Sequence, residues 1–317
     1  MKSGDVSQIL VTCKTESERQ LKLMRAIAQE MFGGNPNYLI GANGSVARRE
    51  CTNGSDVDLY FLFTGNVVFD DVRLAQDNYR NRLKQEGLDM PDPGGVFEDP
   101  LDIEDLLATI GGDDDTNVFI TRRMLFLLEG EWTFNQQLFD QTRTRLINRY
   151  VTEDLSDAKL CLFLLNDVIR YWRTICVDFE HKTADADKPR AIRLIKLRFS
   201  RMLLYLGGVA AVSQTKGQAV TEKRKTLENL FALPTIERMQ SVFGDAMNPP
   251  LQRYETFLTN LNDKGIRQQL KLLGEEGLGT QVYKDLCVEA RDFKEDLLAM
   301  LMDEFGADHD VIKALLL

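Results

Sequence analysis

Asp56 and Asp58 are the residues best placed for chemistry, because they stand two apart at the start of an apolar run, residues 57–63. In a strand, alternate side chains project to the same side, so we expect both carboxylates on one sheet edge. Two hard oxygen ligands on a rigid edge suit Mg²⁺, or Mn²⁺ in its place, together with substrate phosphates. The spacing therefore predicts metal-assisted transfer of a phosphorus-containing group.

Gly44 and Ser45 supply a second chemical feature upstream of the aspartates. They follow a short predicted strand, residues 38–40, and open a short predicted helix, residues 45–50. A glycine allows a close backbone approach that a Cβ would block. Amide groups at a helix N-terminus favour phosphate, and the serine hydroxyl can donate to the same oxygen. We therefore expect Gly44 and Ser45 to bind phosphate.

The order Gly-Ser, about ten residues, then Asp-Val-Asp followed by apolar residues resembles the DNA polymerase β nucleotidyltransferase superfamily. Arg48-Arg49-Glu50 and Gly54-Ser55 extend the likeness to bacterial PII uridylyltransferase, glutamine synthetase adenylyltransferase and uncharacterised nucleotidyltransferases related to them. Residues 120–130 are similar to the segment that follows the catalytic sheet in those proteins. The likeness covers residues 37–130, and beyond them it is only a general likeness to a helical second domain.

The resemblance implies an enzyme that moves a nucleoside monophosphate from an NTP to a hydroxyl acceptor and releases pyrophosphate. Asp56 and Asp58 would bind Mg²⁺, while Gly44 and Ser45 would hold the β- and γ-phosphates. The signalling relatives imply a protein acceptor, adenylylated or uridylylated. A small acceptor such as a cationic antibiotic stays open, as does a toxin–antitoxin or tRNA-directed role. Arg48 and Arg49 are expected to bind phosphate or to be structural partners, one of them pairing with Glu50 or Asp70 on the surface.

A third carboxylate, which the superfamily carries on a later strand, is weakly supported here. The candidate is Glu98, with Asp99 beside it, after a possible strand at residues 96–98. Residues 113–115 are a further acidic option, but their Gly-Gly-Asp-Asp-Asp context is typical of a solvated loop. This weakness keeps a second hypothesis open, a nucleotide-sensing or partner-binding protein with reduced catalysis. A helical adaptor without nucleotide binding is the third.

Residues from about 116 onward show apolar side chains mainly at helical spacing. Basic residues stand out there, and the resemblance suggests that Arg170, Lys196 and Arg193 face the nucleotide. A solvated helix face is the alternative for all three. The fold class predicted is α+β, with a small mixed-sheet catalytic domain at residues 1–150. An all-helical domain that closes over substrate and nucleotide follows at residues 151–317.

Composition restricts the function classes further. A net charge of -10 argues against sequence-independent binding of extended nucleic acid, since such binding depends on Lys and Arg that neutralise phosphates. No apolar stretch approaches the roughly 20 residues of a membrane span, and the first residues lack a signal-peptide core. We therefore expect a cytoplasmic protein. The five cysteines are scattered along the chain, which predicts reduced thiols. With only two histidines, the chain has more residues suited to metal-assisted chemistry than to histidine-based catalysis.

Overall fold

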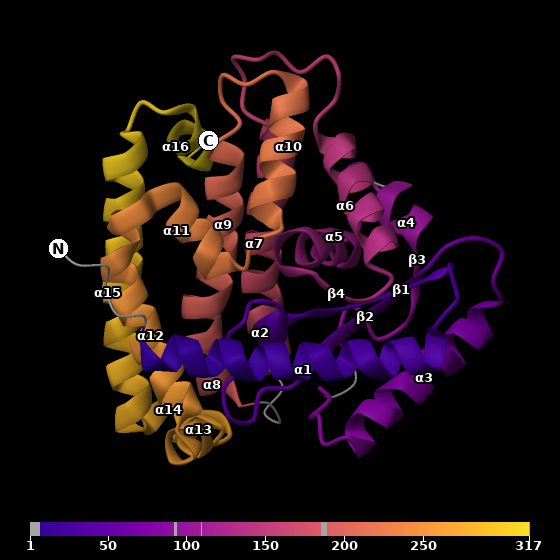
Figure 1. Ribbon diagram of the computed structural model, residues 1–317. Helices are drawn as coiled ribbons and strands as arrows, with labels where there is room; N and C mark the ends of the chain where they lie inside the picture. The colour runs from indigo at the N-terminus through magenta and orange to yellow at the C-terminus, as the bar shows by residue number, and fades with distance from the viewer. Residues whose placement is uncertain (1–6, 92–93, 109, 185–188, 317) are drawn as a thin grey trace. The chain divides into compact units, whose positions relative to one another are not determined.

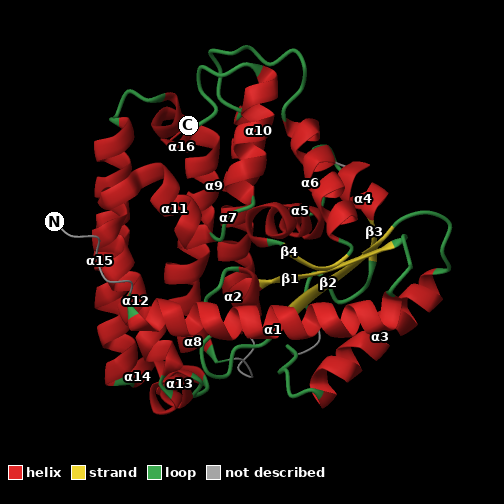
Figure 2. Ribbon diagram, in the orientation of Figure 1, coloured by secondary structure: helices red, strands yellow, loops and turns green. Residues whose placement is uncertain are grey.

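The computed structural model describes residues 7–91, 94–108, 110–184 and 189–316. The chain divides into two compact units. We call Val11–Thr152 the sheet unit, and Glu153–Leu317 with the first residues up to Leu10 the helical unit. All described strands lie in the sheet unit (Figure 2), and helices predominate in both. The structure is therefore mostly helical with one small mixed sheet, compatible with the α+β class.

The sheet unit contains helices and strands in mixed order along the chain (Figure 1). Its helices are α1 (Gln8–Phe32), α2 (Gly44–Ala47), α3 (Phe69–Gln85), α4 (Ile103–Ala108), α5 (Asn117–Glu129) and α6 (Gln136–Tyr150). Its strands are β1 (Tyr38–Asn43), β2 (Asp58–Phe63), β3 (Leu101–Asp102) and β4 (Glu131–Phe134).

The sheet has the strand order β3-β2-β1-β4. β1 pairs antiparallel with both β2 and β4, while β3 runs parallel to β2. In the central pair, Asn43 lies opposite Asp58 and Tyr38 lies opposite Phe63. This register places the end of β1, where α2 begins, beside the start of β2.

Both faces of the sheet are covered. Residues 40 and 42 of β1 and residues 59, 61 and 63 of β2 belong to a core cluster shared with α1 and α3. Figure 1 shows α1 along this face, with α5 on the opposite side. On that opposite face, the Tyr60 ring contacts Phe97 and Phe126 at centroid distances of 5.5 and 5.7 Å. Gly41 lies against Tyr60, because a Cβ there would come within 2.1 Å of the phenol.

The expected strand at residues 96–98 is wrong. Glu98 N donates to the Gly95 carbonyl at 3.1 Å, which closes a turn. A preceding Gly-Gly pair and a following proline favour that turn over an extended segment. The strand begins instead at Leu101, although the apolar spacing of residues 101–110 predicts a helix there. The helix α4 follows the strand, with Glu104 N donating to Asp102 Oδ1 at 2.8 Å.

The helical unit contains no strand in its described residues. Its elements are α7 (Leu162–Ala184), α8 (Arg190–Lys196), the π-helical turn η1 (Leu197–Arg201), α9 (Met202–Ser213), α10 (Val220–Phe231), α11 (Thr235–Phe243), the 3-10 turn η2 (Gly244–Met247), α12 (Asn248–Asn262), α13 (Lys264–Leu270), α14 (Gly274–Gly279), α15 (Gln281–Phe305) and α16 (Asp310–Leu316). None of the helices in the described parts of the chain has the length and hydropathy needed to cross a membrane.

The apolar spacing of residues 155–179 predicts a helix, but the first part of this prediction is wrong, because α7 begins only at Leu162. The buried ammonium of Lys223 accounts for the difference, because it donates to backbone carbonyls of this segment. Its Nζ lies 2.9 Å from the backbone carbonyl oxygen of Asp157, 2.8 Å from that of Lys159 and 2.5 Å from that of Thr215. Carbonyl groups bound to this cation favour an irregular loop over a helix.

All five cysteines are free thiols, as their spacing predicts. Burial raises the pKa of Cys13 to about 12, helped by the charges of Glu50 and Cys51. Because the thiolate is the reactive species, we predict that iodoacetamide labels the half-buried Cys287 at neutral pH at least about 100-fold faster than Cys13. Peptide mass spectrometry of the native protein measures both rates. The denatured protein is the control, and equal native rates would contradict the prediction.

Candidate functional site

The central feature of the site is the close approach of Gly44 to Asp58. Gly44 has a φ of +71°, a left-handed conformation that favours glycine. A Cβ placed on it would lie 2.5 Å from Asp58 Oδ2. The β1–β2 register produces this contact, because Asn43 pairs with Asp58 and Gly44 is the next residue. The Gly44 backbone and the Asp58 carboxylate are therefore neighbours.

Asp56 and Asp58 flank a buried residue. Val57 is 1% exposed and belongs to the core beneath α1 and α3, while both aspartates are partly exposed. Only Asp58 lies within β2, and Asp56 stands in the loop before it. This alternation of burial favours projection of both carboxylates away from the core that holds Val57.

Arg48 lies in a buried ion-pair cluster. Its Nε donates to Glu50 Oε2 at 2.8 Å, and a second guanidinium nitrogen, Nη1, pairs with Glu129 Oε2. The second oxygen of the Glu129 carboxylate, Oε1, accepts the Gly44 amide hydrogen at 3.1 Å. Arg48 thus pairs with Glu50, one of the two expected partners, but inside the protein and not on its surface. The Glu129 carboxylate also ties Arg48 to the backbone of Gly44. A role of Arg48 in phosphate binding stays a prediction.

Ser45 lies in the four-residue helix α2, next to the buried Cys51. Burial raises the pKa of the Cys51 thiol, and hydrogen bonds with the hydroxyls of Ser17 and Ser45 partly oppose that rise. The Ser45 hydroxyl therefore already has a protein contact. The Gly44 amide also has one, through Glu129. Phosphate binding by Gly44 and Ser45 stays a prediction.

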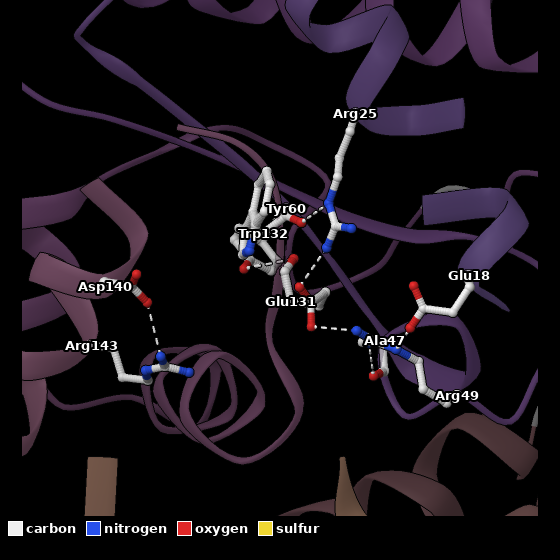
Figure 3. Close-up of polar contacts among 9 residues, drawn as sticks. All are labelled: Glu18, Arg25, Ala47, Arg49, Tyr60, Glu131, Trp132, Asp140 and Arg143. Atoms are coloured by element: carbon white, nitrogen blue, oxygen red, sulfur yellow. Dashed lines mark hydrogen bonds and ion pairs between the residues drawn. The ribbon is translucent and has the colours of Figure 1, made fainter. Parts of the chain in front are cut away.

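Arg49, which also has a left-handed φ of 64°, connects α1, α2 and β4 (Figure 3). Its guanidinium pairs with Glu18 at 2.6 Å and with Glu131 at 2.9 Å. Arg25 also pairs with Glu131, at 2.7 Å, and lies 4.0 Å from the ring centroid of Trp132. These contacts hold the turn after α2 against the helix that covers the sheet.

The candidates for a third carboxylate lie in other local contacts. Glu98 is exposed, and its carboxylate accepts the Gly94 amide hydrogen at 2.6 Å. Asp99 lies 3.6 Å from Arg73, and both side chains are exposed. Asp115 was expected in a solvated loop, but it is buried and pairs with Arg123 at 2.8 Å. Among the described residues, no three or more Asp, Glu, His or Cys side chains are grouped to hold a metal.

The three basic residues predicted to face the nucleotide belong to the helical unit. Arg170 lies 3.9 Å from Asp167, and the Arg193 guanidinium lies 5.9 Å from the ring centroid of Phe179. Burial lowers the pKa of Arg193. Lys196 ends α8, directly before the π-helical turn η1, and is partly exposed. Nucleotide binding by these three residues stays a prediction.

Two residues near Gly44 were missed by the sequence reasoning. Glu129 lies at the end of α5, 85 positions along the chain from the amide that it accepts. Asn43 ends β1 and is 3% exposed. Its polar side chain directly before Gly-Ser was a signal available in the sequence, whereas nothing local marks Glu129.

The buried cluster leads to a stability prediction. Glu129→Ala removes a partner of the buried Arg48 and the acceptor of the Gly44 amide, so it should destabilise the sheet unit by about 3–5 kcal/mol. Glu104→Ala is the matched control, because Glu104 and Arg145 have side chains 60% and 49% exposed and should contribute less than about 1 kcal/mol. Urea unfolding, followed by Trp132 fluorescence in a Trp172→Phe background, measures both. Equal losses would refute the role given to Glu129.

No protein-family model matches the chain, and none of the curated proteins compared with it matches either.

Proposed function

We propose that the protein is a Mg²⁺-dependent nucleotidyltransferase that moves a nucleoside monophosphate from an NTP to a hydroxyl acceptor. The observation that carries the proposal is the contact between Gly44 and Asp58. These two residues are 14 positions apart in the chain, yet they lie so close together that a Cβ on Gly44 would overlap the Asp58 carboxylate. That is the arrangement expected if the Gly-Ser turn and the Asp-x-Asp strand form one site. The motif and its spacing are the other support.

The donor set fits a divalent cation in part. Asp56 and Asp58 are partly exposed and lie on either side of the buried Val57. Carboxylate oxygens are ligands that Mg²⁺ prefers. A cation held there would neutralise charge on the phosphates during transfer. Gly44 places no side chain against the Asp58 carboxylate, while Glu129 accepts its amide hydrogen and pairs with Arg48.

We propose a protein side chain as the acceptor, because the resemblance is to enzymes of protein adenylylation and uridylylation. A cationic small molecule is the alternative, which the net charge of -10 favours. The two differ in product: labelled protein in one case, a labelled small molecule in the other.

A second function, nucleotide sensing without turnover, is favoured by one observation. The described residues contain no group of three or more acids, histidines or cysteines placed for a metal. Binding of an NTP without transfer or pyrophosphate release would support this second function over the first.

The first test measures transfer from each α-phosphate-labelled NTP, with Mg²⁺ or Mn²⁺, to cell lysate and to small acceptors. We predict that Asp56→Asn and Asp58→Asn each lower transfer by about 100-fold or more, because each removes a charge that acts at the reacting phosphates. Asp77→Asn is the matched control, an exposed carboxylate on α3 of the same unit, and should keep full activity. Transfer that survives in both aspartate variants would overturn the proposal.

The second test separates backbone strain from the fit beside Asp58. Gly44→Ala and Gly87→Ala both place a side chain at a left-handed φ, +71° and +84°, and each should destabilise the fold by about 1–2 kcal/mol. Only the Gly44 variant meets Asp58, since nothing lies within 4 Å of a Cβ on Gly87. We therefore expect about 100-fold lower transfer for Gly44→Ala alone. Similar activity in the two folded variants would contradict this.

A further inference from the structure

Asn43 has a buried amide oxygen without a partner. The residue is 3% exposed, and among the described residues its Oδ1 makes no hydrogen bond. Asn43 also stands at the N-cap of α2, where an asparagine oxygen normally accepts an amide hydrogen from the first turn. Here the side chain makes no such capping bond. The oxygen therefore lacks the partner that its position would ordinarily supply.

Burial of an amide without a hydrogen bond costs roughly 1–3 kcal/mol, so an unpartnered atom of this kind needs an explanation. Bulk water does not provide one, because the oxygen has almost no accessible surface. Its partner must be a species bound next to it. A dehydrated cation is smaller than a water molecule and approaches oxygen ligands to about 2.1 Å.

The sheet register places this oxygen beside the candidate metal ligands. Asn43 is the cross-strand partner of Asp58. The next cross-strand pair, Ala42 and Leu59, packs in the core beneath α1 and α3. Because side chains alternate between faces along a strand, Asn43 and Asp58 share the opposite face. Directly paired residues have Cβ atoms about 5 Å apart, near enough for both side chains to reach one ion.

We propose that Asn43 Oδ1 is the third protein ligand of one divalent cation held by Asp56 and Asp58. This inference rests on the proposed function and names a part of its metal site. Amide oxygens are hard donors, which Ca²⁺ accepts readily and which suit Mg²⁺ and Mn²⁺ in the same way. Two carboxylates and one neutral amide carry two negative charges, the number that balances one divalent cation. The site then needs no third carboxylate to hold that cation.

The experiment titrates the full-length protein with Mn²⁺ in the absence of nucleotide and measures free Mn²⁺ by electron paramagnetic resonance. We expect Asn43→Ala to raise the Kd at least about 10-fold, the lower end of what loss of an ordered metal-site partner costs. Asn43→Asp supplies a charged oxygen at the same position and should bind Mn²⁺ at least as tightly as the wild type. Thermal melts establish that each variant is folded.

Gln76→Ala is the matched control, because Gln76 is also buried with an unpartnered amide oxygen but lies on α3. It should leave the Kd unchanged within about twofold. An unchanged Kd in Asn43→Ala, with binding lost in Asp58→Asn, would overturn the Asn43 ligand and leave the proposed function standing. A wild-type protein that leaves all Mn²⁺ free to millimolar concentration would overturn both. Mn²⁺ binding that depends on Asn43, without nucleotidyl transfer, would support the ligand and reject the proposed function.

Discussion

The absence of a side chain at Gly44 is the constraint on which the geometry of the site depends. A Cβ there would overlap the Asp58 carboxylate, so a side chain at this position would displace that carboxylate from the place it occupies beside the turn from β1 into α2. The antiparallel register then fixes which residues share a face, and it brings Asn43 opposite Asp58. The same turn is held from the other side by Glu129, which accepts the Gly44 amide hydrogen.

Several of the basic groups of this acidic protein are bound inside it. Arg48 joins Glu50 and Glu129, Arg123 joins Asp115, and Lys223 binds three backbone carbonyls. Each of these cations is almost fully buried, where removal of one partner would leave an uncompensated charge. Their contacts are therefore structural, and those of Arg48 and Lys223 connect segments that are far apart in the chain.

Long periodic segments were predictable because their own side chains specify them. The apolar spacing of residues 70–84 and of residues 280–305 predicts a helix in each segment, and these helices correspond to α3 and α15. Short segments were not. Residues 96–98 are apolar enough for a strand, but a glycine pair and a proline place them in a turn. The four residues of β4 are too few to show a period. They form a strand because they pair with the edge of β1 that β2 does not occupy.

By itself the sequence determined the Gly-Ser and Asp-x-Asp pairing, the strands on which it depends and the mostly helical second half. These follow from local spacing, since a strand period of two and a helix period of 3.6 can be recognised in any short window. Only the tertiary structure decided that Arg48 is buried between two carboxylates, that Asp115 is an internal ion pair and that the Asn43 oxygen lacks a partner. The pair between Arg48 and Glu129 joins residues 81 positions apart, and the burial of Asp115 and Asn43 also depends on the packing around them. Burial and pairing of a polar group are properties of such contacts, which local spacing does not specify.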